Sequence, residues 1–245
     1  MSVPYGIQSA VGQHQLLIGT GDFVPLSFPD WAGGLNLFMC GAGGNGGAGS
    51  TAAPGVVRGG GGGGASGAIA QLFIPRSRFI PRQMYLYLPL GGTVTPAYLL
   101  TYPDTSVLGY RIWGVNSGGN GAAGTTSNGT GGALAAALDN TNFPLSSFTA
   151  NMFMAGAAGA AGNTAYTMSA KALFISGGPG GGQSNAANTN TQGQNITGIG
   201  LIPTISGGTG PGTNGFNGTY NLMGPNPYSL GGTGGPAWAM VRWVP

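Results

Sequence analysis

The chain carries almost no charge. Only 4% of its 245 residues are charged, glutamate is absent, and seven Lys and Arg stand against four Asp. Soluble monomeric domains usually have about a quarter of their residues charged, which keeps their surfaces soluble. A chain this neutral is therefore expected to be covered by copies of itself or by partners. Its net charge of +3 is too small to indicate specific nucleic-acid binding.

Cysteine and histidine each occur once, as Cys40 and His14. A single cysteine excludes an intrachain disulfide, and Cys40 ends an apolar run, which is typical of a small core residue. Zinc sites need three or four ligands, so this pair is too few to build one. No serine lies in the G-x-S-x-G context of a nucleophile that would use His14. We therefore expect no metal and no cofactor.

The four carboxylates are spread along the chain in turn-like contexts. They are Asp22, Asp30, Asp104 and Asp139. Turn chemistry explains each of them, whereas catalytic sites are built from clustered titratable groups. We therefore predict that the protein is not an enzyme. A cell-surface glycan hydrolase, which would need a pair of these carboxylates, stays open as an alternative.

Long apolar runs are also missing. None reaches the ~18 residues that indicate a transmembrane helix, so no membrane span is expected. The first 20 residues lack the charged and apolar regions of a secretory signal. Synthesis in a cytoplasm without a classical export signal is therefore the expectation.

Glycine is what the chain has in excess, with 53 of 245 residues against a usual ~7%. No Gly-X-Y period runs through the chain, so collagen is excluded. The 41% hydrophobic content and the mean hydropathy of +0.14 argue against disorder. Two structures stay open for glycine runs such as residues 59–64. They are extended polyglycine-II rods packed by backbone contacts, or flexible loops in solvent.

Short apolar runs beside glycine clusters predict strands. The expected strands are residues 15–18, 22–28, 35–40, 68–74, 84–88, 110–115, 152–154, 172–175, 201–206 and 237–244. Short β-rich runs separated by turn residues predict a mainly β fold. We expect a β-sandwich or barrel-like domain with long glycine-rich loops, some of them packed as polyglycine-II rods.

The last run shows the clearest alternation of all. It reads AWAMVRWV over residues 237–244. Trp238, Met240 and Arg242 are expected on one face, and Ala239, Val241 and Trp243 on the other. This alternation predicts a strand.

Glycine content divides the chain at residue 34. Residues 1–34 have few glycines and are predicted to form an N-terminal arm or hairpin that could serve as an attachment segment. Residues 35–245 are predicted to form the glycine-rich β domain. Residues 41–46 match G-x-G-x-x-G, but neither the helix nor the acidic residue of a dinucleotide site follows. We therefore expect no nucleotide cofactor here.

Two groups of side chains are candidates for partner or receptor contacts. They are the arginines Arg76, Arg78 and Arg82 and the aromatic residues Phe216, Tyr220 and Tyr228. Clustered arginines suit phosphate, carboxylate or protein surfaces, and a polar turn is the alternative. Residues 116–130, 183–198 and 209–228 are predicted to be contact loops, because they combine glycine with Asn, Thr, Gln and aromatic residues. Plain solvent-facing connections are the alternative.

The order of the glycine blocks resembles the glycine-rich domain of bacteriophage tail-fibre and other virion proteins. In that family an apolar strand ends in GAGGxGG, and GGGGGAxGxxA leads into a second strand. A Pro-containing turn then precedes a strand that ends in GG, and GGxGGxAxxxxxW closes the domain. The matching pieces here are residues 38–47, 59–70, 75–92 and 231–243. Residues 93–230 follow the pattern loosely. A weaker likeness exists to the T-even-type phage adhesins, whose distal domains pack polyglycine rods between variable loops.

This resemblance implies a non-enzymatic structural protein of a bacteriophage virion. A tail-fibre or spike component that contacts the host surface is the leading expectation, and a capsid-associated decoration, vertex or minor capsid protein is the alternative. The expected partners are other virion proteins, further copies of the chain in a homo-oligomer such as a trimer, and a host glycan or protein receptor. The expected location is the virion, after assembly in the host cytoplasm.

Overall fold

The structure is a computed structural model that describes residues 15–48, 61–78, 83–125, 127, 129–135, 152–155 and 234–245. The strands among them are β1 (Gln15–Ile18), β2 (Phe23–Ser27), β3 (Gly34–Cys40), β4 (Ile69–Pro75), β5 (Gln83–Tyr87), β6 (Ala97–Leu100), β7 (Arg111–Val115), β8 (Met152–Met154) and β9 (Trp238–Val244). Two short 3-10 helices, η1 (Arg76–Arg78) and η2 (Leu108–Tyr110), lie between strands. The predicted mainly β fold is confirmed.

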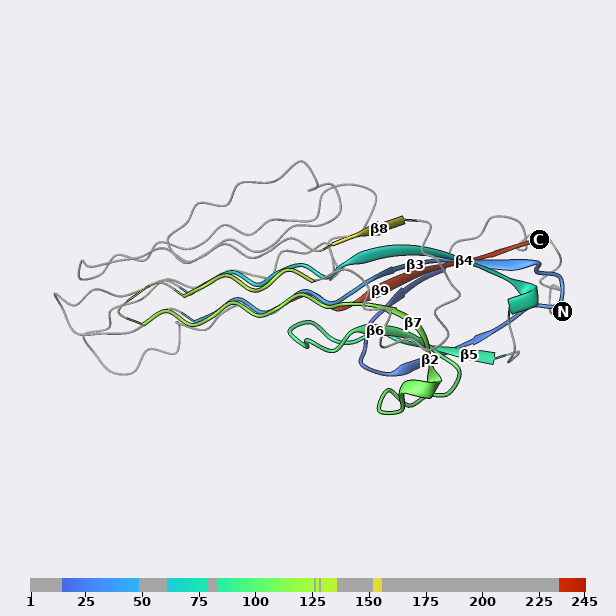
Figure 1. Ribbon diagram of the computed structural model, residues 1–245, viewed down its shortest axis with the longest axis horizontal. Coiled ribbons are helices and arrows are strands. Elements are labelled where there is room, and N and C mark those ends of the chain that lie inside the picture. The colour runs from blue at the N-terminus through green and yellow to red at the C-terminus, as the bar shows by residue number, and fades with distance from the viewer. Residues whose placement is uncertain are drawn as a thin grey trace, which may run out of the picture.

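The strands form two antiparallel sheets, which Figure 1 shows as two layers. The five-stranded sheet has the order β1-β9-β3-β4-β8, and the four-stranded sheet has the order β2-β5-β6-β7. β3 pairs along all seven of its residues with β4 on one side and β9 on the other. The larger sheet is therefore built around β3.

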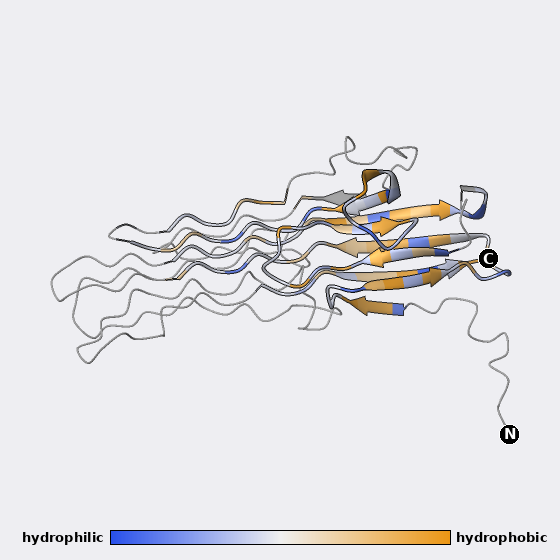
Figure 2. Cartoon of the chain, turned by 90° about the horizontal axis from the view of Figure 1, so that it is seen from below, coloured by the Kyte–Doolittle hydropathy of each residue, from blue (hydrophilic) through white to orange (hydrophobic). Residues whose placement is uncertain are grey.

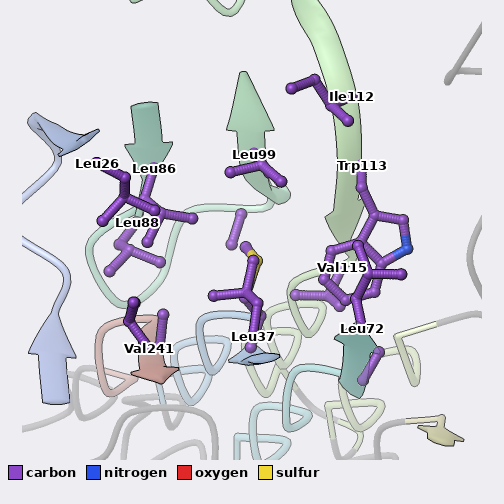
Figure 3. Packing of buried hydrophobic residues seen from close by; sticks show 14 of the residues in the cluster. Leu26, Leu37, Leu72, Leu86, Leu88, Leu99, Ile112, Trp113, Val115 and Val241 are labelled. Atoms are coloured by element: carbon purple, nitrogen blue, oxygen red, sulfur yellow. The ribbon is translucent and has the colours of Figure 1, made fainter. Parts of the chain in front are cut away.

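The two sheets enclose one hydrophobic core. On β3, Leu35, Leu37 and Met39 alternate with outward-facing residues and are fully buried, as the period of two requires. They share the core with inward-facing residues of the other sheet such as Leu86 and Leu99. Figure 3 shows the labelled side chains of the two sheets pointing toward one another. Each fully buried Leu or Met side chain contributes about 1.5–3 kcal/mol relative to its exposed state.

β9 has the two faces predicted from its alternation. Ala239 and Val241 join the core between the sheets. The opposite face carries a second cluster, in which Cys40, Ile69 and Trp238 are buried and Phe38 and Met240 are partly buried. In this cluster the rings of Phe38 and Trp238 stack with their centroids 5.3 Å apart. The five-stranded sheet is therefore buried on both faces around β9.

Most of the predicted strands are present. β1 and β8 have the predicted bounds, and β2, β3, β4, β5, β7 and β9 differ from them by one residue at one or both ends. β6 was not predicted, because its sequence AYLL is short, follows Pro96 and does not run into a glycine cluster. The strands predicted at residues 172–175 and 201–206 lie outside the described residues.

The predicted arm or hairpin of residues 1–34 needs a correction. β1 pairs with β9 in one sheet and β2 pairs with β5 in the other, so the two strands do not form a hairpin with each other. The short connection between them crosses from one layer to the other and contains Gly21 at φ +82°, a conformation that favours glycine. Residues 15–34 are therefore part of the sandwich, while residues 1–14 lie outside the described residues.

Candidate functional site

Three glycine-rich segments run on directly from strands at one end of the sandwich. Residues 41–48 follow β3 and are named rod A, residues 61–68 precede β4 and are named rod B, and residues 116–124 follow β7 and are named rod C. Figure 1 shows them as undulating lines that leave the sheets in a common direction. All of rod B and most of rod A are buried. Figure 2 shows that strongly apolar residues are concentrated on the strands, so the rods need another source of cohesion.

Backbone hydrogen bonds from every third residue join the three rods. Rod A donates to rod B through Gly41→Ala68, Gly44→Ala65 and Gly47→Gly62, with N···O distances of 2.9, 2.8 and 2.7 Å. Rod B donates to rod C through Gly62→Ala122, Ala65→Gly119 and Ala68→Asn116, each at 2.9 Å. Rod C donates to rod A through Gly118→Ala42, Gly121→Asn45 and Gly124→Ala48, at 2.8, 2.8 and 2.7 Å. An extended threefold chain has this spacing, because it makes one turn in three residues and leaves its amides without partners inside the chain.

The pairing of the sheet passes into the rods without a break. Cys40 lies opposite Ile69 at the end of the β3–β4 ladder, and the next bond joins Gly41 to Ala68. Cys40 also lies opposite Trp238 on β9, and Gly43 then donates to the carbonyl of Gly235 at 3.0 Å. The antiparallel register is therefore kept, and the strands hold the rods in alignment.

Glycine is required where the rods approach most closely. A Cβ atom built on Gly41, Gly44 or Gly47 would overlap a backbone carbonyl oxygen of rod C, at Asn116, Gly119 and Ala122 respectively. The same holds for Gly61, Gly64 and Gly67 of rod B against carbonyl oxygens of rod A, and for Gly118 and Gly121 of rod C against those of rod B. Each interface thus combines N–H donors from one rod with close Cα approaches from the other, as Cα–H···O contacts do.

The two layers of the sandwich merge in this bundle. Rods A and B continue strands of the five-stranded sheet, whereas rod C continues β7 of the four-stranded sheet. Packed sheets lie ~10 Å apart because side chains fill the space between them. In the glycine-rich rods no large side chains keep the layers apart, so rod C forms backbone hydrogen bonds directly with rods A and B. A threefold chain offers amides in three directions, so it can bond across the layers as well as within them.

Two further segments extend the bundle. Residues 129–135 are named rod D and accept bonds from rod C through Gly119→Ala133 and Ala122→Thr130, at 3.0 and 2.9 Å. Rod D donates back to rod B through Gly132→Gly63 at 2.8 Å. Residues 234–237, which lead into β9, lie beside rod A.

Two asparagines tie the bundle to the sandwich. The Asn120 side chain accepts a bond from the Asn45 backbone N–H at 2.7 Å and donates to the carbonyl of Gly92 at 3.2 Å. The Asn45 side-chain oxygen accepts from the N–H of Gly234 at 2.7 Å. Gly92, in the β5–β6 connection, has φ +77° and also donates to the carbonyl of Gly43 at 2.8 Å. The junction between bundle and sheets is therefore cross-linked by side chains as well as backbone.

The described turn at the outer end of the bundle is polar. Between rods C and D the exposed Thr125 donates from its backbone N–H to the carbonyl of Ser127 at 2.8 Å, and the hydroxyls of these residues lie 3.3 Å apart. Most of the segment predicted as a contact loop at residues 116–130 is bonded within the bundle as rods C and D and is not a free loop, and its contact role stays a prediction. Some side chains along the two rods still face solvent, among them Asn120 and Leu134. The predicted loops 183–198 and 209–228 lie outside the described residues.

Arg76 serves an intramolecular purpose at the opposite end of the sandwich. Its guanidinium donates to the carbonyl oxygens of Pro29, Asp30 and Ala32, which form the turn before β3. It also lies 3.7 Å from the Asp30 carboxylate and 5.4 Å from the centre of the Phe28 ring. Arg76 therefore braces a turn, which is compatible with the polar-turn alternative. Its contact with a partner stays a prediction.

Of the other predicted contact residues, only Arg78 is among the described residues. Arg78 closes η1 beside Arg76 in the chain. Arg82, Phe216, Tyr220 and Tyr228 lie outside the described residues, so their contact roles stay predictions. One aromatic surface was not predicted as a unit: the outer face of the four-stranded sheet, made of Phe23, Tyr85, Tyr87, Tyr98 and Leu100. The alternation in residues 84–88, which places Tyr85 and Tyr87 on the same face of a strand, is the sequence feature that could have predicted this surface.

The described residues hold little that could do chemistry. Burial raises the pKa of the Cys40 thiol well above its ordinary value, which keeps it protonated and unreactive. Burial also raises the pKa of Tyr98, although Arg111, 4.7 Å from its ring centre, opposes the shift. Bonds from Ser106 lower the pKa of the exposed Asp104. Within the described ranges no three His, Cys, Asp or Glu residues gather as metal ligands, and no helix is long and apolar enough to cross a membrane.

No family model matches the chain, and no curated protein matches its sequence. Its function therefore has to be inferred from the geometry of the bundle and the sandwich.

Proposed function

We propose that the chain is a non-enzymatic structural protein of a bacteriophage virion, and that it acts as a tail-fibre or spike component at the host surface. In this role the sandwich is the base and the glycine bundle is a spacer. The bundle holds the turns at its outer end away from the sheets, where they contact a glycan or protein receptor. The protein is then located in the virion after assembly in the host cytoplasm.

The observation that carries the proposal is the closed ring of hydrogen bonds among rods A, B and C. Each rod is bonded at three successive points to the next, and rods A and B continue the β3–β4 ladder in unbroken register. Such a bundle cannot bend at its base without breaking the ladder. A stiff, charge-poor extension that ends in a short polar turn is a scaffold for recognition, because loops on rigid supports lose little entropy on binding.

The low charge also supports association with other chains. We propose that the protein forms a homo-oligomer, such as a trimer, and contacts other virion proteins, since closed symmetric assembly covers a neutral surface. Light scattering on the purified chain tests this part. A stable, monodisperse species at the monomer mass of 24.1 kDa would contradict it.

Adsorption to the host tests the receptor role. Purified chain, added to host cells before the phage, should slow phage adsorption by occupying the receptor. Ser127→Trp places bulk on the outer turn and should abolish this competition while leaving the melting temperature unchanged. Val94→Trp is the matched control, because Val94 is 66% exposed in the β5–β6 connection near the base of the bundle.

Two results would contradict the receptor role. One is a wild-type chain that neither binds host cells nor slows adsorption. The other is labelling of the particle heads by antibody to the chain, which would favour a capsid-associated protein. Loss of viscosity when the chain is incubated with host polysaccharide would instead revive the glycan hydrolase.

A further inference from the structure

β8 is positioned to send a further segment into the bundle. It lies at the edge of the five-stranded sheet, next to β4 on the side away from β3 (Figure 1). Its last residue, Met154, lies opposite Ile69, the residue that Cys40 faces from the other side. β3 and β8 are both antiparallel to β4, so both run toward the bundle. The chain therefore leaves β8 beside rod B, just as rod A leaves β3.

The sequence that follows β8 has the pattern of a rod. Residues 155–162 read AGAAGAAG, with glycine at every third position and alanine at all the others. Rods A and B likewise need glycine at every third position, where they approach the backbone of a neighbouring rod. The rods carry alanine at positions between these glycines, such as Ala42, Ala65 and Ala122. Three glycines in eight residues disfavour a helix, which is the other structure that an alanine-rich segment could form.

The register of the β4–β8 ladder determines where this segment would lie. Continued past Met154 without a break, the ladder brings Ala155 opposite Ala68 and Ala158 opposite Ala65. The β3–β4 ladder passes into rods A and B in the same unbroken way. Rod B is buried along its whole length. A continuation of β8 would cover the side of rod B that is opposite rod A.

We propose that residues 155–162 form a fifth rod, named rod E, which packs along rod B on the side opposite rod A. The described segment that contains β8 ends at Ala155, and residues 156–162 lie outside the described residues. A threefold chain offers amides in three directions, so rod B can bond to rod E as well as to rods A, C and D. A segment built only from glycine and alanine has no side chain large enough to prevent this approach.

The length of rod E matches the bundle. Eight residues of a threefold chain span about 25 Å, and in register they bring residue 162 opposite Gly61. That is the level of Ala48, which accepts the bond from Gly124 immediately before the outer turn. Rod E therefore broadens the spacer of the proposed function along its full length. The rod itself does not depend on the virion role.

Chain continuity favours this segment over a rod from a second copy. Ala155 is joined directly to a strand that is already paired with β4. Contact between residues 155–162 and rod B is therefore intramolecular, and its effective concentration exceeds that of a separate chain.

Nuclear Overhauser contacts between alanines test the position of rod E. The full chain is labelled with isotopic alanine, and the signals of Ala65, Ala68, Ala155 and Ala158 are assigned from single Ala→Gly variants. Contacts are expected between Ala155 and Ala68 and between Ala158 and Ala65. The pair Ala158 and Ala68 is the control, because it is three residues out of register, or about 9 Å along the rod.

Three results would overturn the proposal. One is the control contact in place of the expected pairs. Another is the absence of any contact between residues 155–162 and rod B. The third is contact only between labelled and unlabelled copies in a mixed sample, which would mean that a second chain packs against rod B. Each result concerns rod E alone and leaves the virion role to its own adsorption test.

Gly159→Ala provides a second test, because a rod, a helix and a flexible loop predict different signs. In rod E the new methyl group should overlap a neighbouring rod, as at Gly44, and should lower the melting temperature by about 4 °C or more. In a helix, alanine would raise the melting temperature, and in a flexible loop it would leave it unchanged or slightly raised. Gly109→Ala is the control, because a Cβ atom there meets nothing within 4 Å. A raised or unchanged melting temperature for Gly159→Ala would overturn rod E.

Discussion

Substitution of Gly44 by Ala is the sharpest test of the rod bundle. The new methyl group would overlap the carbonyl oxygen of Gly119, which is backbone and cannot rotate away. Rods A and C therefore have to separate at this point. Three backbone hydrogen bonds join the rods next to Gly44: Gly44→Ala65 at 2.8 Å, Ala65→Gly119 at 2.9 Å and Gly121→Asn45 at 2.8 Å.

The expected cost follows from those bonds. Each intramolecular hydrogen bond contributes about 1 kcal/mol net, and a buried amide left without a partner costs about 1–3 kcal/mol. Gly44→Ala should therefore lower the free energy of unfolding by about 3 kcal/mol. For a domain of this size that corresponds to a fall in melting temperature of about 6–12 °C.

Gly109→Ala supplies the matched control, since the chemical change is identical. A Cβ atom on Gly109, in η2, would meet nothing within 4 Å, and its φ is outside the positive region. Alanine there restricts the unfolded chain and should stabilise the protein by at most about 1 kcal/mol. Thermal and urea denaturation followed by circular dichroism measure both variants. Equal effects of the two substitutions would refute the close approach of rods A and C.

Three further outcomes are expected. In urea denaturation, Arg76→Ala should lower the free energy of unfolding by about 1–2 kcal/mol, because three turn carbonyls lose their donor. Asp30→Asn should lower it by less than about 0.5 kcal/mol, because the Asp30 side chain is 90% exposed. The raised pKa of Cys40 means that the folded state stays protonated while the unfolded thiol ionises above about pH 8.5. Stability is therefore fully present below that pH and should fall by about 1.4 kcal/mol per pH unit above it, a slope that Cys40→Ala should remove in pH-dependent denaturation. Asn120→Ala deletes a bond to Asn45 and one to Gly92, and calorimetry should show a loss of about 1–2 kcal/mol; an unchanged melting curve would mean that the junction does not depend on this side chain.

The strands were predictable because their signal is local. Apolar residues at alternate positions specify a face wherever they occur, and β9 shows this clearly with Trp238 on one face and Val241 on the other. β6 escaped prediction because four residues, AYLL, are too few to show a period. Its place is set by its neighbours β5 and β7, which a reading of local sequence does not include.

The rods were only partly predictable, for a physical reason. Extended glycine packing was expected in general, but in residues 41–47 the required glycines at every third position are hidden among additional glycines. Which rod packs against which is harder still to predict, because glycine has no side chain to distinguish one neighbouring rod from another. Register is instead inherited from the strands, as the continuity from Cys40 to Gly41 shows. The pairing of residues 41–48 with residues 116–124 therefore becomes visible only once both sheets are assembled.

The candidate site differed from prediction for the same reason. Residues 116–124 have the composition of a polar loop, yet the amides of Gly118, Gly121 and Gly124 donate to rod A and those of Gly119 and Ala122 to rod D. The three arginines have the composition of an anion site, yet Arg76 is occupied by turn carbonyls that only the folded chain brings to it. The support of the turn before β3 was not predictable from local sequence either, because Arg76 lies 44 positions after Ala32, whose carbonyl it binds.

Hydrogen exchange of the rod amides tests the central claim most directly. If the glycine-rich segments form the closed bundle, peptides covering residues 41–48, 61–68 and 116–124 should be protected from exchange to the same degree as peptides covering β3 and β4. Protection should fall in Gly44→Ala and persist in Gly109→Ala. Exchange of these peptides at the rate of an unfolded chain, while β3 and β4 stay protected, would show that the segments are flexible loops and would contradict the bundle.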